Sequence, residues 1–385
     1  MTQHWHAQQD CLEIFAMPFY WRLSESISAS VIPSRLAIRL NRVEAYDYLE
    51  YRPTPLELQA INMAYQQDAN IGFLNPESGQ MNTYGSSVNR FFLSVLQQYP
   101  AEKIYEIGCG AGFSIQYAAQ HGFKVTGIDP SEYSLRWSER LGFELLNTFF
   151  DESLIAGQAD LIFCNDVFEH VPQVDQFCRA VYKSLKPGGV FCFSTTNSSQ
   201  SIALGDISML EHQHVNMFTE QSIYLLLQQA GFSDVSVGGG SYGNTFQVIA
   251  RKQKGVCVIP SSLPVNTCQG YFDRAQKMLS RFHNFYREIG HSSHYYVPLR
   301  AIPYLASVGN FGDSDVFDSN KSWQGKYIDG YERPIKSVSD LNYQPGESFF
   351  IGSMTFYQEI KKMLMEHGYP EHSIYSISSL SDFDV

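Results

Sequence analysis

The stretch "YEIGCGAGFSI", Tyr105 to Ile115, decides the fold of this chain. A strand-like run is followed by glycines at every second position, Gly108, Gly110 and Gly112, and then by a helical pattern. Glycine allows the backbone to turn sharply and allows a ligand to approach the main chain closely. The stretch therefore predicts a junction between a strand and a helix, which is either a ligand-binding loop or only a tight turn.

The sequence on both sides of this junction repeats the same alternation from about Lys103 to Lys252. Short apolar runs such as "KVTGID", "ADLIFCN" and "VFCFSTTN" predict strands, and patterns such as "FSIQYAAQHG" and "YSLRWSERLG" predict helices that end at glycine. Such alternation is typical of a mostly parallel sheet with helices on both faces. We therefore expect a doubly wound α/β domain.

Acidic and aromatic residues follow the predicted strands at positions that suit a nucleoside. Asp129 ends the second strand in "VTGIDPS", where a carboxylate can accept hydrogen bonds from both ribose hydroxyls of an adenosine-type cofactor. In "LLNTFFDES", Phe149 and Phe150 could flank an adenine, and Asp151 could accept a hydrogen bond from its amino group. The fourth strand, in "FCNDVFEHV", ends at the same crevice.

Taken in order, E-x-G-x-G-x-G, "GID", "DLIFCNDVFEHVPQ" and "LKPGGVFCFST" resemble a class I S-adenosylmethionine-dependent methyltransferase. A nicotinamide dehydrogenase shares the strand, glycine and acid pattern but has no counterpart of "EHVPQVDQF" or "LKPGG". The resemblance implies a Rossmann-like core and S-adenosylmethionine as methyl donor. The donor-binding residues that it implies are Glu106, Gly108, Cys109, Gly110, Gly112 and Phe113 for the methionine part, Asp129 with Pro130 for the ribose, Phe150 and Asp151 for the adenine, and Asn165 at the end of the fourth strand.

Composition restricts the partners of the chain. A net charge of −12 over 385 residues, with no Lys/Arg cluster, opposes binding to nucleic acid or to a lipid surface. We see neither a long apolar run nor a basic start before an apolar segment, so we expect no membrane span and no signal peptide. The seven cysteines are scattered without a CxxC pair, as in a cytoplasmic protein with reduced thiols, and no metal site is expected.

The length of the chain predicts more than one domain. Residues 1–90 are expected to form an irregular lid or substrate-side domain, and residues 91–254 the donor-binding core. A helical linker is expected over residues 255–290, and a smaller α/β unit over residues 291–385, where strand and helix patterns alternate again.

The C-terminal stretch "VFDSNKSWQGKYIDGYERPIKSVSDL" resembles the corresponding domain of sugar C-methyltransferases, enzymes that act on nucleotide-linked keto-sugars. The "HEH" of that family follows the fifth strand of the core, where this chain has "HQH", His212 to His214. By resemblance His214 is the candidate base, and His170 in "EHVP" its orienting or relay partner. Glu211 stands where that family commonly has an aromatic hydroxyl, and it is a further candidate catalytic residue. Methylation of carbon next to a ketone requires removal of a proton, and histidine suits this role because its pKa is near neutrality.

Departures from that family leave other functions open. Gln213 replaces a glutamate, and the zinc-ligand cysteines of the N-terminal domain are missing. The alternatives are O- or N-methylation of another small metabolite, and a non-catalytic donor-binding module whose flanking domains bind partners.

Three further features have a functional and a structural interpretation each. His212 and His214 would lie on one face of an extended segment, either at a substrate or as loop anchors. Tyr84 could cover the methionine end of the donor or pack as a helix residue. Asp318 in "FDSN" resembles a ribose-binding acid, although no glycine loop precedes it.

Overall fold

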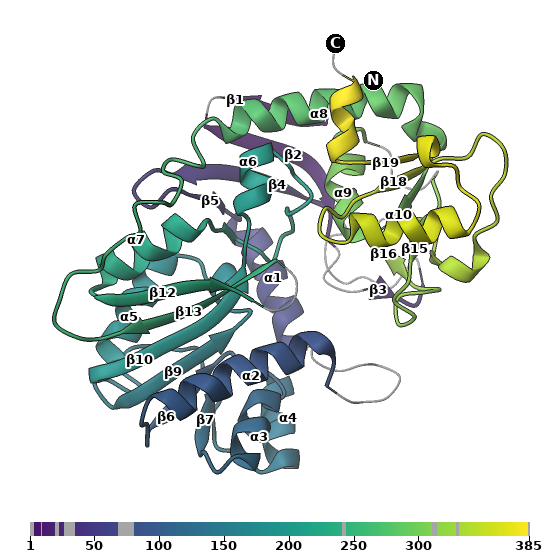
Figure 1. The fold of residues 1–385 in the computed structure, drawn as a ribbon. Coiled ribbons are helices and arrows are strands. Elements are labelled where there is room, and N and C mark those ends of the chain that lie inside the picture. The colour runs from purple at the N-terminus through teal and green to yellow at the C-terminus, as the bar shows by residue number, and fades with distance from the viewer. Residues whose placement is uncertain are drawn as a thin grey trace.

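The structure is a computed structural model that describes residues 4–8, 10–19, 23–26, 35–67, 81–240, 244–296, 298–309, 314–328 and 331–383. Figure 1 shows a core α/β layer at the lower left, a group of N-terminal strands above it and a second α/β unit at the right. The long helix α8 runs across the top, close to both labelled ends of the chain.

The core contains a seven-stranded sheet in the order β12-β13-β10-β9-β6-β7-β8. Strands β6 to β10 pair with one another in parallel, whereas β13 is antiparallel to both of its neighbours, β10 and β12. The bounds of these strands are β6 Ile104–Ile107, β7 Val125–Ile128, β8 Leu145–Leu146, β9 Ala159–Asn165, β10 Leu185–Thr196, β12 Asp234–Gly239 and β13 Thr245–Arg251.

Helices cover both faces of this sheet because its central strand is apolar on both sides. Within β9, Leu161 and Phe163 pack with α2 and α3, while Ile162 and Cys164 pack with α5 and α7. Such a strand reads as a continuous hydrophobic run, as parallel strands buried on both faces do. The helices of this layer are α2 Thr83–Gln98, α3 Phe113–Gln120, α4 Glu132–Leu141, α5 Val174–Ser184 and α7 Glu220–Ala230. The predicted doubly wound α/β fold is confirmed.

An antiparallel sheet in the order β1-β2-β4-β5-β11 lies above the core and was not predicted from the sequence. Its strands are β1 Trp5–Gln8, β2 Cys11–Pro18, β4 Arg35–Val43, β5 Tyr48–Tyr51 and β11 Asn216–Met217. The last of these comes from the core, since Asn216 pairs with Glu50 and Met217 with Leu49. The "HQH" segment is therefore fixed to the N-terminal sheet immediately after His214.

The C-terminal unit is a five-stranded, all-parallel sheet in the order β17-β15-β14-β18-β19. Its strands are β14 His294–Tyr296, β15 Val316–Asp318, β17 Ile335–Ser337, β18 Phe349–Ile351 and β19 Ile374–Ser376, and its helices are α9 Pro298–Ser307 and α10 Tyr357–Glu366. A short pairing of β3, Leu23–Ser24, with β16, Tyr327–Ile328, connects it to the N-terminal part. The remaining helices are α1 Pro55–Gln67, α6 Ser199–Leu204 and α8 Tyr271–Glu288.

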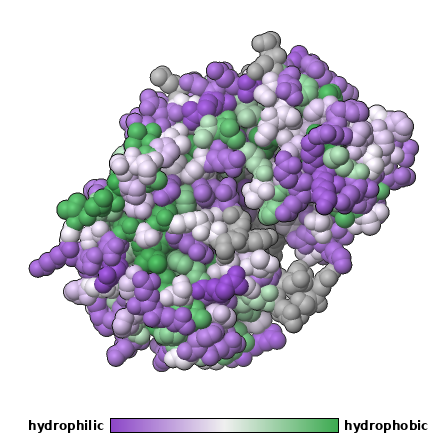
Figure 2. Space-filling model, viewed as in Figure 1, coloured by the Kyte–Doolittle hydropathy of each residue, from purple (hydrophilic) through white to green (hydrophobic). Residues whose placement is uncertain are grey.

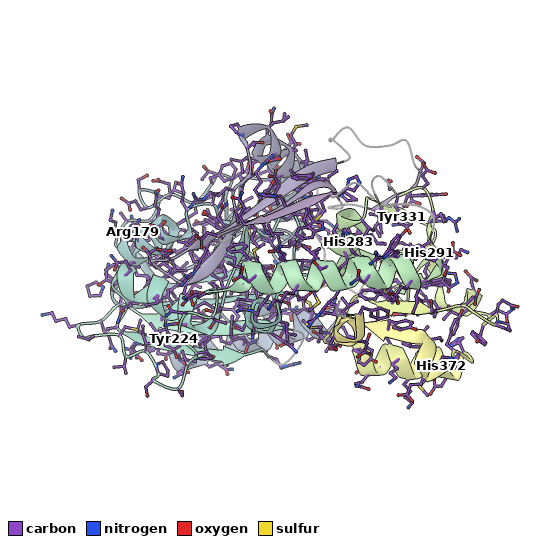
Figure 3. All side chains as sticks on the ribbon, turned by 90° about the horizontal axis from the view of Figure 1, so that it is seen from above. Arg179, Tyr224, His283, His291, Tyr331 and His372 are labelled. Carbon is purple, nitrogen blue, oxygen red and sulfur yellow. The ribbon has the colours of Figure 1, made fainter. Side chains whose placement is uncertain are left out.

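Helix α8 belongs to a hydrophobic core that joins the parts of the molecule. Its buried face, which includes Phe282 and Phe285, packs in one cluster with residues of the N-terminal sheet and of the C-terminal unit. In Figure 3, α8 spans the molecule between Arg179 and Tyr224 of the core layer and His372 of the C-terminal unit. None of the described helices is long and apolar enough to cross a membrane. The division into four domains stays a prediction.

Candidate active site

A cavity of about 820 Å³ lies at the carboxyl ends of the parallel core strands and reaches the C-terminal unit. The surface in Figure 2 is hollowed where the two α/β parts face each other. Open α/β sheets bind ligands at this edge. The donor residues predicted from the sequence line the cavity, except Gly112 and Asp151; those that do are Glu106, Gly108, Cys109, Gly110, Phe113, Asp129, Pro130, Phe150 and Asn165.

The glycine loop leaves room for a ligand against the main chain. Gly108, Gly110 and Gly112 have positive φ angles of 70°, 50° and 71°, which favour glycine. A Cβ atom at Gly108 would lie 2.4 Å from Cγ2 of Val167. Gly112 has a structural role, since it precedes α3 and packs under the ring of Phe143.

Glu106 places a buried carboxyl group at the base of this loop. Burial raises its pKa to about 8, with the charge of Asp129 acting in the same direction. Its Oε2 atom has no hydrogen-bond partner among the described residues. A ligand ammonium group, such as that of the methionine part of S-adenosylmethionine, fits this unsatisfied acceptor.

Asp129 lies at the end of β7, as predicted, and holds the loop in shape. Its Oδ2 accepts from the backbone N–H of Gly110 at 3.0 Å, and its Oδ1 accepts from the N–H of Ser131 at 2.9 Å. Phe149 and Phe150 line the cavity nearby. Asp151 is exposed, accepts from the N–H of Ser153 at 2.8 Å and is not among the residues that line the cavity, so its role at the adenine stays a prediction.

The other end of the cavity contains an ionic pair, His214 with Glu211. Nε2 of His214 lies 2.7 Å from Oε1 of Glu211, and both side chains are largely buried. Burial disfavours the charge of each group, but their attraction outweighs it, raising the pKa of His214 and lowering that of Glu211 to about 2.

His170 lies beside this pair, with 4.9 Å between its ring centroid and that of His214. Its Nδ1 is 2.8 Å from the carbonyl oxygen of Gln213, so Nδ1 carries the proton and donates it. Burial, with the charge of His214, lowers the pKa of His170 to about 4. The three predicted catalytic residues, His214, His170 and Glu211, are thus brought together by two loops that follow β9 and β10.

Two further carboxyl groups from the turn after β9 face the same space. Asp166 accepts a hydrogen bond from Tyr84, and burial, with the charge of Glu169, raises the pKa of Asp166 to about 6. Glu169 accepts from the hydroxyl of Thr195 at 2.9 Å. Tyr84 lines the cavity, and its role in covering the methionine end of the donor stays a prediction.

His212 points away from the cavity, so the expectation that both histidines share one face was wrong. Its Nε2 is 3.1 Å from the carbonyl oxygen of Leu36, and its ring packs against Phe19 and Tyr51 in the N-terminal sheet. The segment is a loop and not an extended strand, so alternate residues need not point the same way.

The C-terminal unit contributes residues to the cavity that sequence reasoning missed. Arg300 of α9 lines it and donates from Nη1 to the carbonyl oxygen of Ser208 at 3.2 Å. The loop 352–356 after β18 lies at the same end. In the C-terminal sheet, β15 lies on one side of β14 and β18 on the other, so the strand order reverses between β14 and β18. Arg300, in the helix after β14, and the loop 352–356, after β18, lie at this reversal, where open α/β sheets bind ligands. Asp318 does not line the cavity, and its Oδ1 accepts from the N–H of Asn320 at 2.8 Å.

Comparisons with known proteins agree with this arrangement of the core. Residues 80–237 match the model of a methyltransferase domain family. The chain carries a class I S-adenosylmethionine-dependent methyltransferase domain. The predicted methyltransferase core is thereby confirmed, and S-adenosylmethionine is its methyl donor.

Similar proteins are ubiquinone biosynthesis O-methyltransferases from Idiomarina loihiensis and Bordetella avium. The first is 27% identical over 158 residues, which cover 36% of this chain and 64% of that protein. The second is 29% identical over 164 residues, which cover 38% of this chain and 68% of that protein. The methyltransferase-domain match therefore spans just under two thirds of the first relative. Among solved structures, human N-acetylserotonin methyltransferase in complex with S-adenosylmethionine is 23% identical, with a TM-score of 0.36, over 45% of this chain and 52% of that one.

Proposed function

We propose that this protein transfers a methyl group from S-adenosylmethionine to a small polar molecule, and that this acceptor is a nucleotide-linked keto-sugar or a related intermediate methylated on carbon. The observation that carries the proposal is the buried pair of His214 and Glu211 in the cavity that also contains the glycine loop. When bound, S-adenosylmethionine supplies a methyl group activated by a positively charged sulfur.

In this proposal the His214 side chain takes the proton from the carbon next to the acceptor ketone. Glu211 stabilises the imidazolium that forms and holds the ring in position, as a carboxylate does for a catalytic histidine. The proton moves from carbon to an imidazole nitrogen, and the electron pair left behind forms the enolate. His170, held by the Gln213 carbonyl group, limits the position of the acceptor on the other side.

The far end of the cavity supports an acceptor with an anionic part. Arg300 adds a permanent positive charge there, and the loop 352–356 adds the hydroxyls of Ser353 and Thr355. These groups suit phosphate oxygens. A nucleotide-linked sugar would place its diphosphate towards the C-terminal unit and its sugar ring near His214.

O-methylation is the second candidate, and the names of the O-methyltransferase relatives favour it. In that case the His214 side chain takes a hydroxyl proton of the acceptor. The two candidates are distinguished by the product. A panel of keto-sugar nucleotides and hydroxylated metabolites is incubated with donor labelled at the methyl carbon, and the carbon NMR shift of the product tells a C-methyl from an O-methyl group.

The variant His214→Ala tests the role of the base. We expect transfer to fall by about 10²–10⁴-fold, the usual contribution of a general base, with donor affinity unchanged. His367→Ala, an exposed histidine at the end of α10, is the matched control. Unchanged turnover in His214→Ala would remove the base role. Donor binding without transfer to any compound of the panel would favour the non-catalytic alternative.

A further inference from the structure

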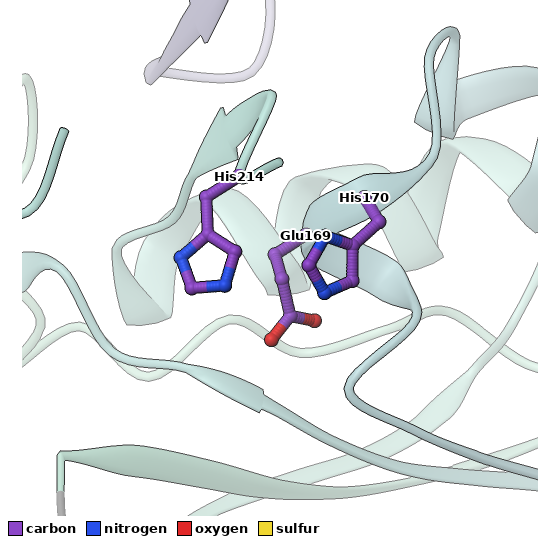
Figure 4. Close-up of side chains that lie close together, drawn as sticks. All are labelled: Glu169, His170 and His214. Carbon is purple, nitrogen blue, oxygen red and sulfur yellow. The ribbon is translucent and has the colours of Figure 1, made fainter. Parts of the chain in front are cut away.

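Three side chains at the acceptor end converge on one point. One ligand atom each from Glu169, His170 and His214 lies within 4.8 Å of the other two. In Figure 4 the Glu169 carboxylate lies between and below the two imidazole rings. The sequence alone did not predict this cluster, because two of its members precede β10 and the third follows it.

Hydrogen bonds from outside the cluster fix the side chains of His170 and Glu169, as they do for metal ligands. His170 donates its Nδ1–H to the carbonyl oxygen of Gln213, so Nε2 is the ring nitrogen that carries the lone pair. The hydroxyl of Thr195 donates to Oε2 of Glu169. Metal-ligating histidines and carboxylates are usually fixed by such outer hydrogen bonds.

The charges at this end also favour a cation. Three carboxyl groups, those of Asp166, Glu169 and Glu211, line this part of the cavity, whereas Arg300 is the one arginine or lysine among its described lining residues. All three cluster residues line the cavity, which gives an ion a path of entry.

We propose that Glu169, His170 and His214 bind one divalent transition-metal ion such as Zn²⁺, and that the ion blocks the base. Two imidazoles and a carboxylate suit Zn²⁺ and its neighbours in the first transition row. Bonds of about 2.0–2.1 Å bring the ligand atoms to roughly 3.4 Å from one another, so the side chains close by about 1 Å on binding.

The ion and the acceptor proton exclude each other at His214. A metal-bound nitrogen has no lone pair for a proton, so the loaded protein binds the donor but does not methylate. This inference rests on the proposed function for its effect on turnover, but not for the binding of the ion.

The test uses the full chain, treated with a chelator and then titrated with Zn²⁺ in equilibrium dialysis with elemental analysis. One tight ion per chain is expected, and Co²⁺ in its place should give the visible absorption of nitrogen and oxygen coordination. His170→Ala should weaken Zn²⁺ binding by more than about 100-fold, and Thr195→Val, which removes only the outer hydrogen bond, by about tenfold. The exposed His121→Ala is the control, because a histidine outside the cluster should change nothing.

Equal Zn²⁺ affinity in wild type, His170→Ala and His121→Ala would overturn the site, because the ion would then bind elsewhere, for example at thiols. With the acceptor identified in the panel, Zn²⁺ should inhibit in competition with the acceptor and leave donor affinity unchanged. A rise of turnover with Zn²⁺ would overturn the blocking role. Failure of donor binding would contradict the proposed function while leaving the dialysis result valid.

Discussion

Glu106 shows how one buried carboxyl group connects stability to donor binding. Its pKa of about 8 in the folded protein lies above its ordinary 4.5, so the stability associated with its neutral form is lost as pH rises from about 5 to 9. In the donor-free protein this loss is on the order of 3–5 kcal/mol. Glu106→Gln stays neutral, so we expect the melting temperature of the variant to fall less between pH 6 and 9 than that of the wild type.

The same substitution should weaken donor binding by about 10–100-fold, because it removes a charged hydrogen bond to the ligand ammonium group. Isothermal titration calorimetry at pH 8 measures this loss. A variant that binds the donor as tightly as the wild type would show that Glu106 is only a buried structural acid.

At the scale of single residues, the sequence predicted the roles of those residues whose type is required by the local backbone geometry. Glycines with positive φ and the acid at the end of β7 are fixed by local backbone geometry, so their roles could be expected. Asp151 and His212 could not be placed, because their partners, Ser153 in a local turn and Leu36 on a distant strand, depend on loop conformation and tertiary pairing.

At the scale of elements, the loop before His214 is held by Asp206. This fully buried carboxylate accepts from the N–H of Ser208 at 2.8 Å, from the hydroxyl of Ser201 at 2.9 Å and from the hydroxyl of Tyr304 in α9 at 2.7 Å. The loop that leads to His214 is thus attached to the C-terminal unit.

Asp206→Asn replaces one acceptor oxygen with a donor, so at least one of these bonds is lost in a buried place. We expect a loss of about 2–4 kcal/mol in the free energy of unfolding, measured by urea denaturation. Asp234→Asn, which removes an exposed pairing with Arg251, should cost less than about 1 kcal/mol. Equal effects of the two variants would contradict the role of Asp206.

Strands and helices with a clear pattern of apolar residues could be predicted from the sequence, whereas the other elements could not. The alternating strands and helices of the core and of residues 294–376 follow from apolar runs that end at glycine or proline. The strands between Trp5 and Tyr51 were missed, although β2 and β4 alternate between core and surface, because aromatic and polar residues obscure the pattern. Strand β11 has only two residues and exists through its pairing with β5.

At the scale of the whole molecule, the two α/β units both contribute residues to one cavity. Arg300 belongs to the C-terminal unit, yet its charge adds to the effect of His214 that lowers the pKa of Glu211, and it opposes the rise in the pKa of His214. The sequence could not predict this, because a single arginine in "VPLRAIP" has no local signature and its position depends on the packing of α9 beside the core loop.

We expect Arg300→Ala to raise the acceptor KM by about 10–100-fold through the loss of a charged hydrogen bond, with donor affinity unchanged. Steady-state kinetics with the acceptor from the panel measures this effect. Arg333→Ala is the control, since that arginine pairs with Asp315 and does not line the cavity. A parallel change in donor affinity would argue against an acceptor-side role for Arg300.

The most direct test of the central claim is donor binding by calorimetry and thermal shift with two matched variants. Asp129 and Asp318 each end the second strand of a parallel sheet, but only Asp129 lines the cavity. S-adenosylmethionine at about 100 times its Kd should stabilise the wild type and Asp318→Asn by about 2.7 kcal/mol, and Asp129→Asn far less. No stabilisation of the wild type, or equal stabilisation of Asp129→Asn, would contradict the account.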